Sequence, residues 1–251
     1  MTALSVNVNK VALLRNTRDV GYPSVLAAAR ACIDAGAHGI TVHPRPDQRH
    51  IRPADVFDLA EMLAGERGIE YNIEGNPFAG RRGTYPGFLA LVRKTCPTQC
   101  TLVPDTLAQS TSDHGWDIAK DSKRLRPLLE ELQGLGIRVS LFVDPVLDMI
   151  KRAKDLGADR VELYTEPYAS AFAHRKNLAA VFARYKRAAA LARKIGLGVN
   201  AGHDLNLDNL PKFMAIPGIL EVSIGHALVA DALWMGWHRT VRAYLAAIKS
   251  K

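Results

Sequence analysis

One unit recurs along the chain: a stretch with helical periodicity ends near a glycine, and a short run rich in β-branched residues follows at once. Clear copies lie at residues 36–43, 136–144, 157–165 and 196–203. Glycine suits the left-handed position that closes a helix. The run after it is apolar enough to be covered on both faces, as parallel strands are. Each copy therefore predicts a helix, a tight turn and a buried strand.

Further strands complete the alternation. We expect them at 4–9, 69–74, 99–104 and 220–226, with helices at 24–35, 53–64, 86–95, 122–135, 146–156, 175–194, 207–214 and 227–248. Regular strand and helix alternation in 251 residues favours a closed barrel over an open doubly wound sheet. The predicted fold class is α/β, a single (β/α)8 TIM barrel that forms one domain over residues 1–251.

The composition indicates in which compartment the protein is expected and which partners it is expected to bind. No apolar run approaches the roughly 18 residues of a membrane span, and no secretory signal opens the chain, so we expect a cytoplasmic protein without a membrane partner. Cys32, Cys96 and Cys100 are odd in number and lack CxxC spacing, which predicts buried thiols rather than disulfides or metal ligands. The net charge of +8 is spread over helical stretches, which favours acidic small substrates over nucleic acid.

Polar side chains follow or end several predicted strands. Asn7, Asn9 and Lys10 lie at the end of the first strand, Glu70, Asn72 and Glu74 belong to the third, and His43, His203 and His226 end three others. Because the carboxyl ends of barrel strands meet on one face, these groups are expected to lie together. Imidazole exchanges protons near neutral pH, and burial raises a carboxyl pKa towards that range. His43, Glu70 and His203 are therefore the predicted acid and base groups.

The loop after His43 places Arg45 and His50 close together, which suggests either a metal site or an anion site. The anion site is favoured, because a guanidinium group repels a cation and binds phosphate with a forked pair of hydrogen bonds. Gly202 and Gly225 lie near the ends of the seventh and eighth strands, where barrels often bind phosphate with backbone amides. The sequence thus predicts small phosphorylated substrates and no metal.

Two segments and the last helix leave alternatives open. The arginines of 15–18 either bind a ligand or lie in solvent, and 105–115 forms either a lid or a surface insertion. Trp234 faces either solvent or another subunit. It lies off an apolar stripe that is expected in the core, formed by Val229, Leu233, Trp237, Val241, Tyr244 and Ile248.

Short motifs run nearly from one end of the chain to the other: NVNKVA at 7–12, LRN at 14–16, AGAHGITVH at 35–43, DQRHI at 47–51, LVP at 102–104, VNAGH at 199–203 and SIGHA at 223–227. This set resembles the pyridoxine 5′-phosphate synthase family, barrel enzymes that close the ring in one bacterial route to vitamin B6. The resemblance implies a transferase that condenses 1-deoxy-D-xylulose 5-phosphate with 3-amino-2-oxopropyl phosphate. The products are pyridoxine 5′-phosphate, phosphate and water, with no metal or organic cofactor.

The resemblance also implies roles for single residues. His43 and Glu70 would form the acid and base pair, and His203 would donate a proton. The residues that would bind the two substrates are Asn7, Asn9, Lys10, Arg18, Arg45, His50, Thr111, Asp204, Gly225 and His226. Members of the family assemble from dimers into an octamer, so a homo-oligomer is expected.

Four positions depart from the family pattern. Asn9 and Lys10 stand where Asp and His are usual, so an amide replaces a carboxylate and a fixed cation replaces an imidazole. Asp204 replaces a glycine beside the expected phosphate site, and Pro44 removes a backbone donor. Two alternatives therefore stay open: another phosphosugar-converting barrel enzyme, in which Lys10 forms an imine, and a non-catalytic paralogue that binds phosphate ligands.

Overall fold

Parallel strands close into a barrel in this computed structural model, which describes residues 1–18 and 20–249. The barrel order is β1 (Ala3–Asn7), β2 (Gly39–Val42), β3 (Glu70–Gly75), β4 (Gln99–Leu102), β5 (Arg138–Val143), β6 (Arg160–Tyr164), β7 (Gly198–Gly202) and β8 (Glu221–Ile224). Each strand pairs with its neighbours in the sequence, and β8 returns to β1 with Leu4 opposite Val222. The predicted barrel is confirmed.

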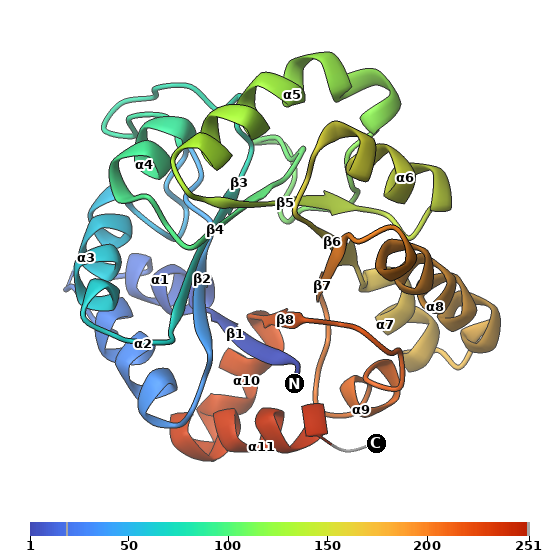
Figure 1. The fold of residues 1–251 in the computed structure, drawn as a ribbon. Helices are drawn as coiled ribbons and strands as arrows, with labels where there is room; N and C mark the ends of the chain where they lie inside the picture. The colour runs from blue at the N-terminus through green and yellow to red at the C-terminus, as the bar shows by residue number, and fades with distance from the viewer. Residues whose placement is uncertain (19, 250–251) are drawn as a thin grey trace.

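Helices surround the strands, and Figure 1 shows them as an outer ring. They are α1 (Asn9–Asn16), α2 (Val25–Asp34), α3 (Pro53–Ala64), α4 (Phe88–Thr95), α5 (Ile118–Gly134), α6 (Leu147–Leu156), α7 (Glu166–Ala173), α8 (Leu178–Lys194), α9 (Leu210–Phe213), α10 (His226–Met235) and α11 (Trp237–Lys249). None of the described helices combines the length and apolar character needed to cross a membrane.

Local chemistry explains several helix ends. Ser24 begins α2, because its side chain accepts a hydrogen bond from the Ala27 amide at 3.2 Å. Gly157 ends α6 in the left-handed conformation, with φ of 99°, and β6 begins three residues later at Arg160. The predicted sequence of helix, glycine turn and strand is confirmed there.

The predicted helices differ from the structure at three places. The helices α1 and α7 were not expected, and the last predicted helix is divided at Gly236, whose φ is 77°. The predicted stripe does not stay buried: Leu233 of α10 is 70% exposed, whereas Val229 of the same helix and Val241 of α11 are buried. Trp234 is 90% exposed. The thiol prediction also failed in part, since Cys96 is exposed while Cys32 and Cys100 are buried.

The inner surface of the barrel is polar at its amino-terminal end. Arg138 forms an ion pair with Glu70 and donates a hydrogen bond to Gln99 at 2.9 Å. Glu70 is the first residue of β3, and Glu74 follows four residues later on the same inward face, about 13 Å further along the strand. The prediction that Glu70 lies at the barrel mouth is therefore wrong. Glu74 occupies that position.

Candidate active site

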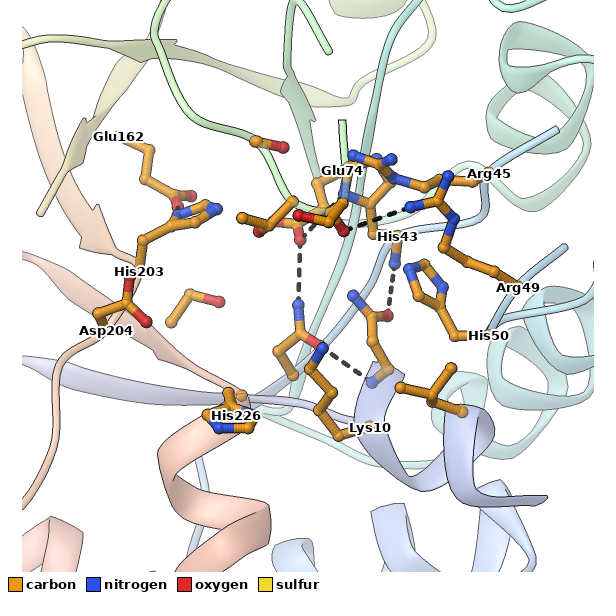
Figure 2. A pocket seen from close by; sticks show the side chains of 18 residues that line it. Lys10, His43, Arg45, Arg49, His50, Glu74, Glu162, His203, Asp204 and His226 are labelled. Carbon is orange, nitrogen blue, oxygen red and sulfur yellow. Dashed lines mark hydrogen bonds and ion pairs between the residues drawn. The ribbon is translucent and has the colours of Figure 1, made fainter. Parts of the chain in front are cut away.

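A cavity of about 420 Å³ opens at the carboxyl ends of the strands. Figure 2 shows His203 on one side of this cavity, His43, Arg45 and His50 on the other, and Glu74 between them. The predicted site residues that line it are Asn7, Asn9, Lys10, His43, Arg45, His50, Thr111, His203, Asp204, Gly225 and His226. Neither Arg18 nor Glu70 lines it. The loop 105–115 contributes Ser110 and Ser112 as well as Thr111, so the lid interpretation is favoured.

Arg18 is exposed beyond the end of α1, as the solvent alternative predicted. The buried arginine of this segment is Arg15, which forms an ion pair with Asp55 of α3. Arg15 also donates a hydrogen bond to the carbonyl of His50 at 3.3 Å. Arg15 thus fixes the loop that carries His50 rather than a ligand.

Two asparagines link β1 and α1 to the reactive groups. The Asn7 side chain donates a hydrogen bond to Glu74 Oε1 at 3.0 Å and accepts one from the Asn9 amide at 3.0 Å. The Asn9 side chain accepts the His43 backbone N–H at 2.9 Å (Figure 2). An amide oxygen performs this accepting role as a carboxylate would. The departure at Asn9 is therefore compatible with an intact site.

His43 lies between two carboxylates. Its Nε2 is 3.1 Å from Asp105 Oδ2, and its Nδ1 is 3.5 Å from Glu74 Oε1. Burial alone would lower the pKa of His43, but Asp105 and Glu74 outweigh it and raise the pKa to about 9. His43 is therefore a cation at neutral pH.

Arg45 binds the protein rather than facing the cavity as a free anion site. Its guanidinium group forms an ion pair with Asp105 and donates to the carbonyl of Gln109 at 2.7 Å. Arg49 donates to the same carbonyl at 3.0 Å and to the carbonyl of Leu107 at 3.0 Å. These two arginines hold the loop 105–115 against the rim. Arg45 thus anchors the lid, and because it also lines the cavity, its role in ligand binding stays a prediction.

His50 is a neutral hydrogen-bond donor. Its Nδ1 accepts the Ile51 amide at 2.9 Å, which leaves the ring proton on Nε2. Burial, followed by the positive charges of His43, Arg45 and Lys10, lowers the pKa of His50 to about 3. The cations near His50 make this side of the cavity attractive to an anion.

His203 packs against two aromatic rings at the opposite side. The ring centroids of Phe142 and Tyr164 lie 4.8 Å and 5.4 Å from that of His203. His203 Nδ1 is 4.0 Å from Glu162 Oε1 and has no hydrogen-bond partner. Burial lowers the pKa of His203, although Glu74 and Asp204 oppose the shift. His203 is therefore neutral and able to accept a proton.

Glu162 was missed by sequence reasoning. It is 1% exposed, and one carboxyl oxygen has no hydrogen-bond partner. Burial and then the charges of Glu74 and Glu221 raise its pKa well above the usual value, so Glu162 is neutral. A lone acid within the apolar run of β6 is the signal that could have identified it.

The amino end of α10 closes the cavity beside β8. Gly225 precedes the helix, and a β-carbon there would lie 3.1 Å from the Asn7 side chain, so only glycine packs freely. The first N–H groups of a helix lack partners within it and attract anions. Asp204 lines the same region in a left-handed conformation, with φ of 59°. Within the described residues, no group of three or more potential ligands is arranged to hold a metal ion.

Distant solved structures share the barrel. A thiamine phosphate pyrophosphorylase from Pyrococcus furiosus matches with a TM-score of 0.61 and 11% identity, covering 98% of this chain and 95% of that one. A triosephosphate isomerase from Bartonella henselae matches with a TM-score of 0.59 and 10% identity, covering 98% and 100%. At such identity these likenesses support the fold alone.

Sequence comparison identifies nearer relatives. A protein from Xanthomonas axonopodis pv. citri (strain 306) named pyridoxine 5′-phosphate synthase is 58% identical over 250 residues, covering 99% of this chain and 97% of that protein. Another of that name, from Xylella fastidiosa (strain M12), is 56% identical over 250 residues, covering 99% and 95%. The family model for the pyridoxal phosphate biosynthesis protein PdxJ matches residues 4–250. The chain belongs to the PdxJ family.

Proposed function

We propose that this chain is a pyridoxine 5′-phosphate synthase that condenses 1-deoxy-D-xylulose 5-phosphate with 3-amino-2-oxopropyl phosphate. One structural observation supports the proposal most strongly. The charged imidazole of His43, the neutral imidazole of His203 and the amino end of α10 all line a single cavity. The full-length similarity to synthases supports the same reaction. The products are pyridoxine 5′-phosphate, phosphate and water.

The charges of the cavity orient the two substrates. One phosphate lies against the amino end of α10, where the backbone amides of Gly225 and His226 donate. The other lies near Lys10 and His50, and Thr111 of the lid covers it. The two reacting carbonyl and amine groups then meet between His43 and His203. Asp204 lies beside the first phosphate, and its carboxylate would repel a fully ionised phosphate group. It therefore favours a substrate whose phosphate keeps a proton or which carries an amine there.

The proton transfers follow from the charge states. Condensation of an amine with a ketone expels the ketone oxygen as water, so an acid must protonate that oxygen. His43 supplies this proton because it is charged at neutral pH. Ring closure removes protons from carbon, and Glu74 or neutral His203 accepts them. His203 thus acts as a proton donor only after it has accepted a proton.

Glu162 serves this site as a positioning residue. Its carboxyl group lies 4.0 Å from His203 Nδ1, and Figure 2 shows it next to the His203 ring. A neutral acid there leaves the pKa of His203 low, whereas a carboxylate would raise it. The acid and the aromatic rings of Phe142 and Tyr164 together hold His203 ready to accept a proton.

The assay for the proposed function uses the purified protein with both substrates. Formation of pyridoxine 5′-phosphate, followed by chromatography, and release of phosphate in equal amounts are expected. Binding of either substrate without turnover would contradict the proposal and favour a non-catalytic paralogue. Borohydride trapping of substrate on Lys10 would instead favour an imine-forming phosphosugar enzyme.

The pH dependence of kcat/KM tests His43. A proton donor must be protonated, so kcat/KM is expected to fall above pH 9, by about tenfold per pH unit in the limit. Initial rates between pH 7 and pH 10.5, at subsaturating substrate, measure this limb. If kcat/KM rises through pH 9, neutral His43 is the active form and its role as an acid is wrong.

A Glu162→Gln variant tests the buried acid. Because the pKa of Glu162 is raised in the folded state, the native protein keeps a proton that the unfolded chain releases, and stability falls as pH rises above the unfolded pKa. The glutamine of the variant does not titrate, so the stability of the variant does not fall in this way. The unfolding free energy of the variant minus that of the parent is expected to grow between pH 5 and pH 8, by up to about 1.4 kcal/mol per pH unit. Urea unfolding at each pH measures it.

Glu130→Gln is the matched control, since Glu130 is exposed on α5. It should leave stability unchanged at every pH. A Glu162→Gln difference that stays constant between pH 5 and pH 8 would mean that Glu162 is ionised in the native protein.

We also propose that residues 1–251 act as one domain, in the cytoplasm, as a homo-oligomer. The exposed side chains of Leu233 and Trp234 on α10 support an interface between subunits, because their burial would remove a large apolar area from water. Sedimentation velocity at micromolar concentration distinguishes a monomer from the octamer that the family resemblance implies.

A further inference from the structure

A second cavity, here called the outer pocket, adjoins the active site and has a volume of about 400 Å³. The loop after β2, the segment after β3 and the start of the lid form its walls. Its residues are His43, Pro44, Arg45, Pro46, Asn76, Phe78, Ala79, Gly80, Arg81, Arg82, Asp105, Thr106 and Leu107. His43 and Arg45 also line the active-site cavity, so these two side chains separate the two spaces.

The segment after β3 is held in place by hydrogen bonds. The Asn76 side chain donates to the Asp105 carbonyl at 2.7 Å and accepts the Phe78 amide at 2.9 Å. The Ala79 carbonyl accepts the Phe88 amide at 2.9 Å. Tyr85 is buried, and its hydroxyl donates to the Pro44 carbonyl at 3.3 Å. A wall fixed in this way loses little freedom when it binds a ligand.

The rim of the outer pocket carries positive charge that the protein does not neutralise. Arg81 and Arg82 are both exposed, and within the described chain neither forms an ion pair with a carboxylate. Arg45, by contrast, is paired with Asp105. Two guanidinium groups without a carboxylate partner that line one pocket suit a phosphate group, which arginine binds with charge-assisted, forked hydrogen bonds.

Part of the pocket wall is apolar. Phe78 is 41% exposed, with Arg124 stacked 4.1 Å from its centroid, and Leu107, Ala79 and Pro46 complete the apolar surface. A flat apolar body therefore fits beside the two free arginines. Orthophosphate alone would leave this surface in contact with water.

We propose that the outer pocket binds a phosphate monoester with a planar ring, the chemical class of the product, as a second site next to His43. This inference rests on the proposed function, which supplies such a pyridine phosphate. The phosphate lies between Arg81 and Arg82, and the ring lies on Phe78 and Leu107. A ligand held there contacts the Asp105 and Arg45 pair, which in turn contacts the catalytic His43 and the lid.

Isothermal titration of the full chain with pyridoxine 5′-phosphate tests the proposal. Two molecules are expected per chain, one in each cavity. In an Arg81→Gln/Arg82→Gln variant the second site should weaken at least about tenfold, because two charge-assisted contacts are lost, while turnover and the first site are unchanged. Arg67→Gln/Arg187→Gln removes two exposed charges elsewhere and should keep both sites.

Three results would overturn the outer site: one molecule per chain, a double arginine variant that binds the second molecule as tightly as the unsubstituted protein does, or orthophosphate that fills the second site as tightly as the ester. Turnover of the unsubstituted protein is measured in parallel. Turnover with a single binding site would reject the outer pocket alone. Two binding sites without turnover would support the pocket and reject the synthase function.

Discussion

Replacing His203 by asparagine is expected to lower kcat by about 10²-fold to 10⁴-fold while the fold is kept. His203 is the neutral imidazole on its side of the cavity, and a side-chain amide cannot exchange protons near neutral pH. Asparagine is preferred to alanine because His203 has φ of 84°, and asparagine tolerates positive φ better. Steady-state assays with both substrates measure the loss.

The control for this variant is His238→Asn, since His238 is exposed on α11. It should retain full turnover. Near-equal circular dichroism spectra and thermal unfolding of the two variants would establish that the His203 change acts on chemistry. If the His203 variant retains more than about a tenth of the parent kcat, His203 takes no part in the rate-limiting proton transfer.

The barrel itself could be predicted because its signals are local. Each glycine turn, such as Gly157 before β6, marks a helix end within a few residues of a buried strand. The helix α1 was missed because Asn9 and Lys10 read as the end of the first strand, although helix α1 starts at Asn9 directly after Val8. Strand and helix meet there without a turn residue to separate them.

The depth of a residue in the barrel was harder to predict. Glu70, Asn72 and Glu74 share one face of β3, and periodicity alone ranks them equally. Their interaction partners show at which depth each residue lies. Glu70 pairs with Arg138 at the amino-terminal end of the barrel, whereas Glu74 accepts a hydrogen bond from Asn7 at the mouth. Those partners come from other strands, so the register of the closed barrel had to be known first.

The charge partners of the site were hidden for the same reason. Arg45 looked free for phosphate in the sequence, but it is paired with Asp105, which lies 60 positions further along the chain. Glu162 gave no motif, because its importance comes from its place 4.0 Å from His203. Residue types at strand ends predicted the location of the site, while pairings across the barrel determined the charge of each group.

The pairing around Asp105 leads to the second large effect. An Asp105→Asn variant is expected to lose about 3 kcal/mol of unfolding free energy, because the buried Arg45 guanidinium loses its carboxylate partner. The same change removes the main carboxylate that raises the pKa of His43. The alkaline limb of kcat/KM should therefore move from about pH 9 to lower pH. Urea unfolding and the pH profile give the two readouts.

Asp47→Asn provides the matched control. Asp47 is exposed and pairs with Arg49 on the loop after β2, the loop that also carries Arg45. An exposed pair contributes less than about 1 kcal/mol, so stability should change little and the pH limb should stay in place. The two readouts separate two roles of Asp105. A loss of stability with an unmoved pH limb would mean that Asp105 anchors the lid through Arg45 but does not control the proton of His43, and Glu74 would then be the carboxylate that keeps His43 charged.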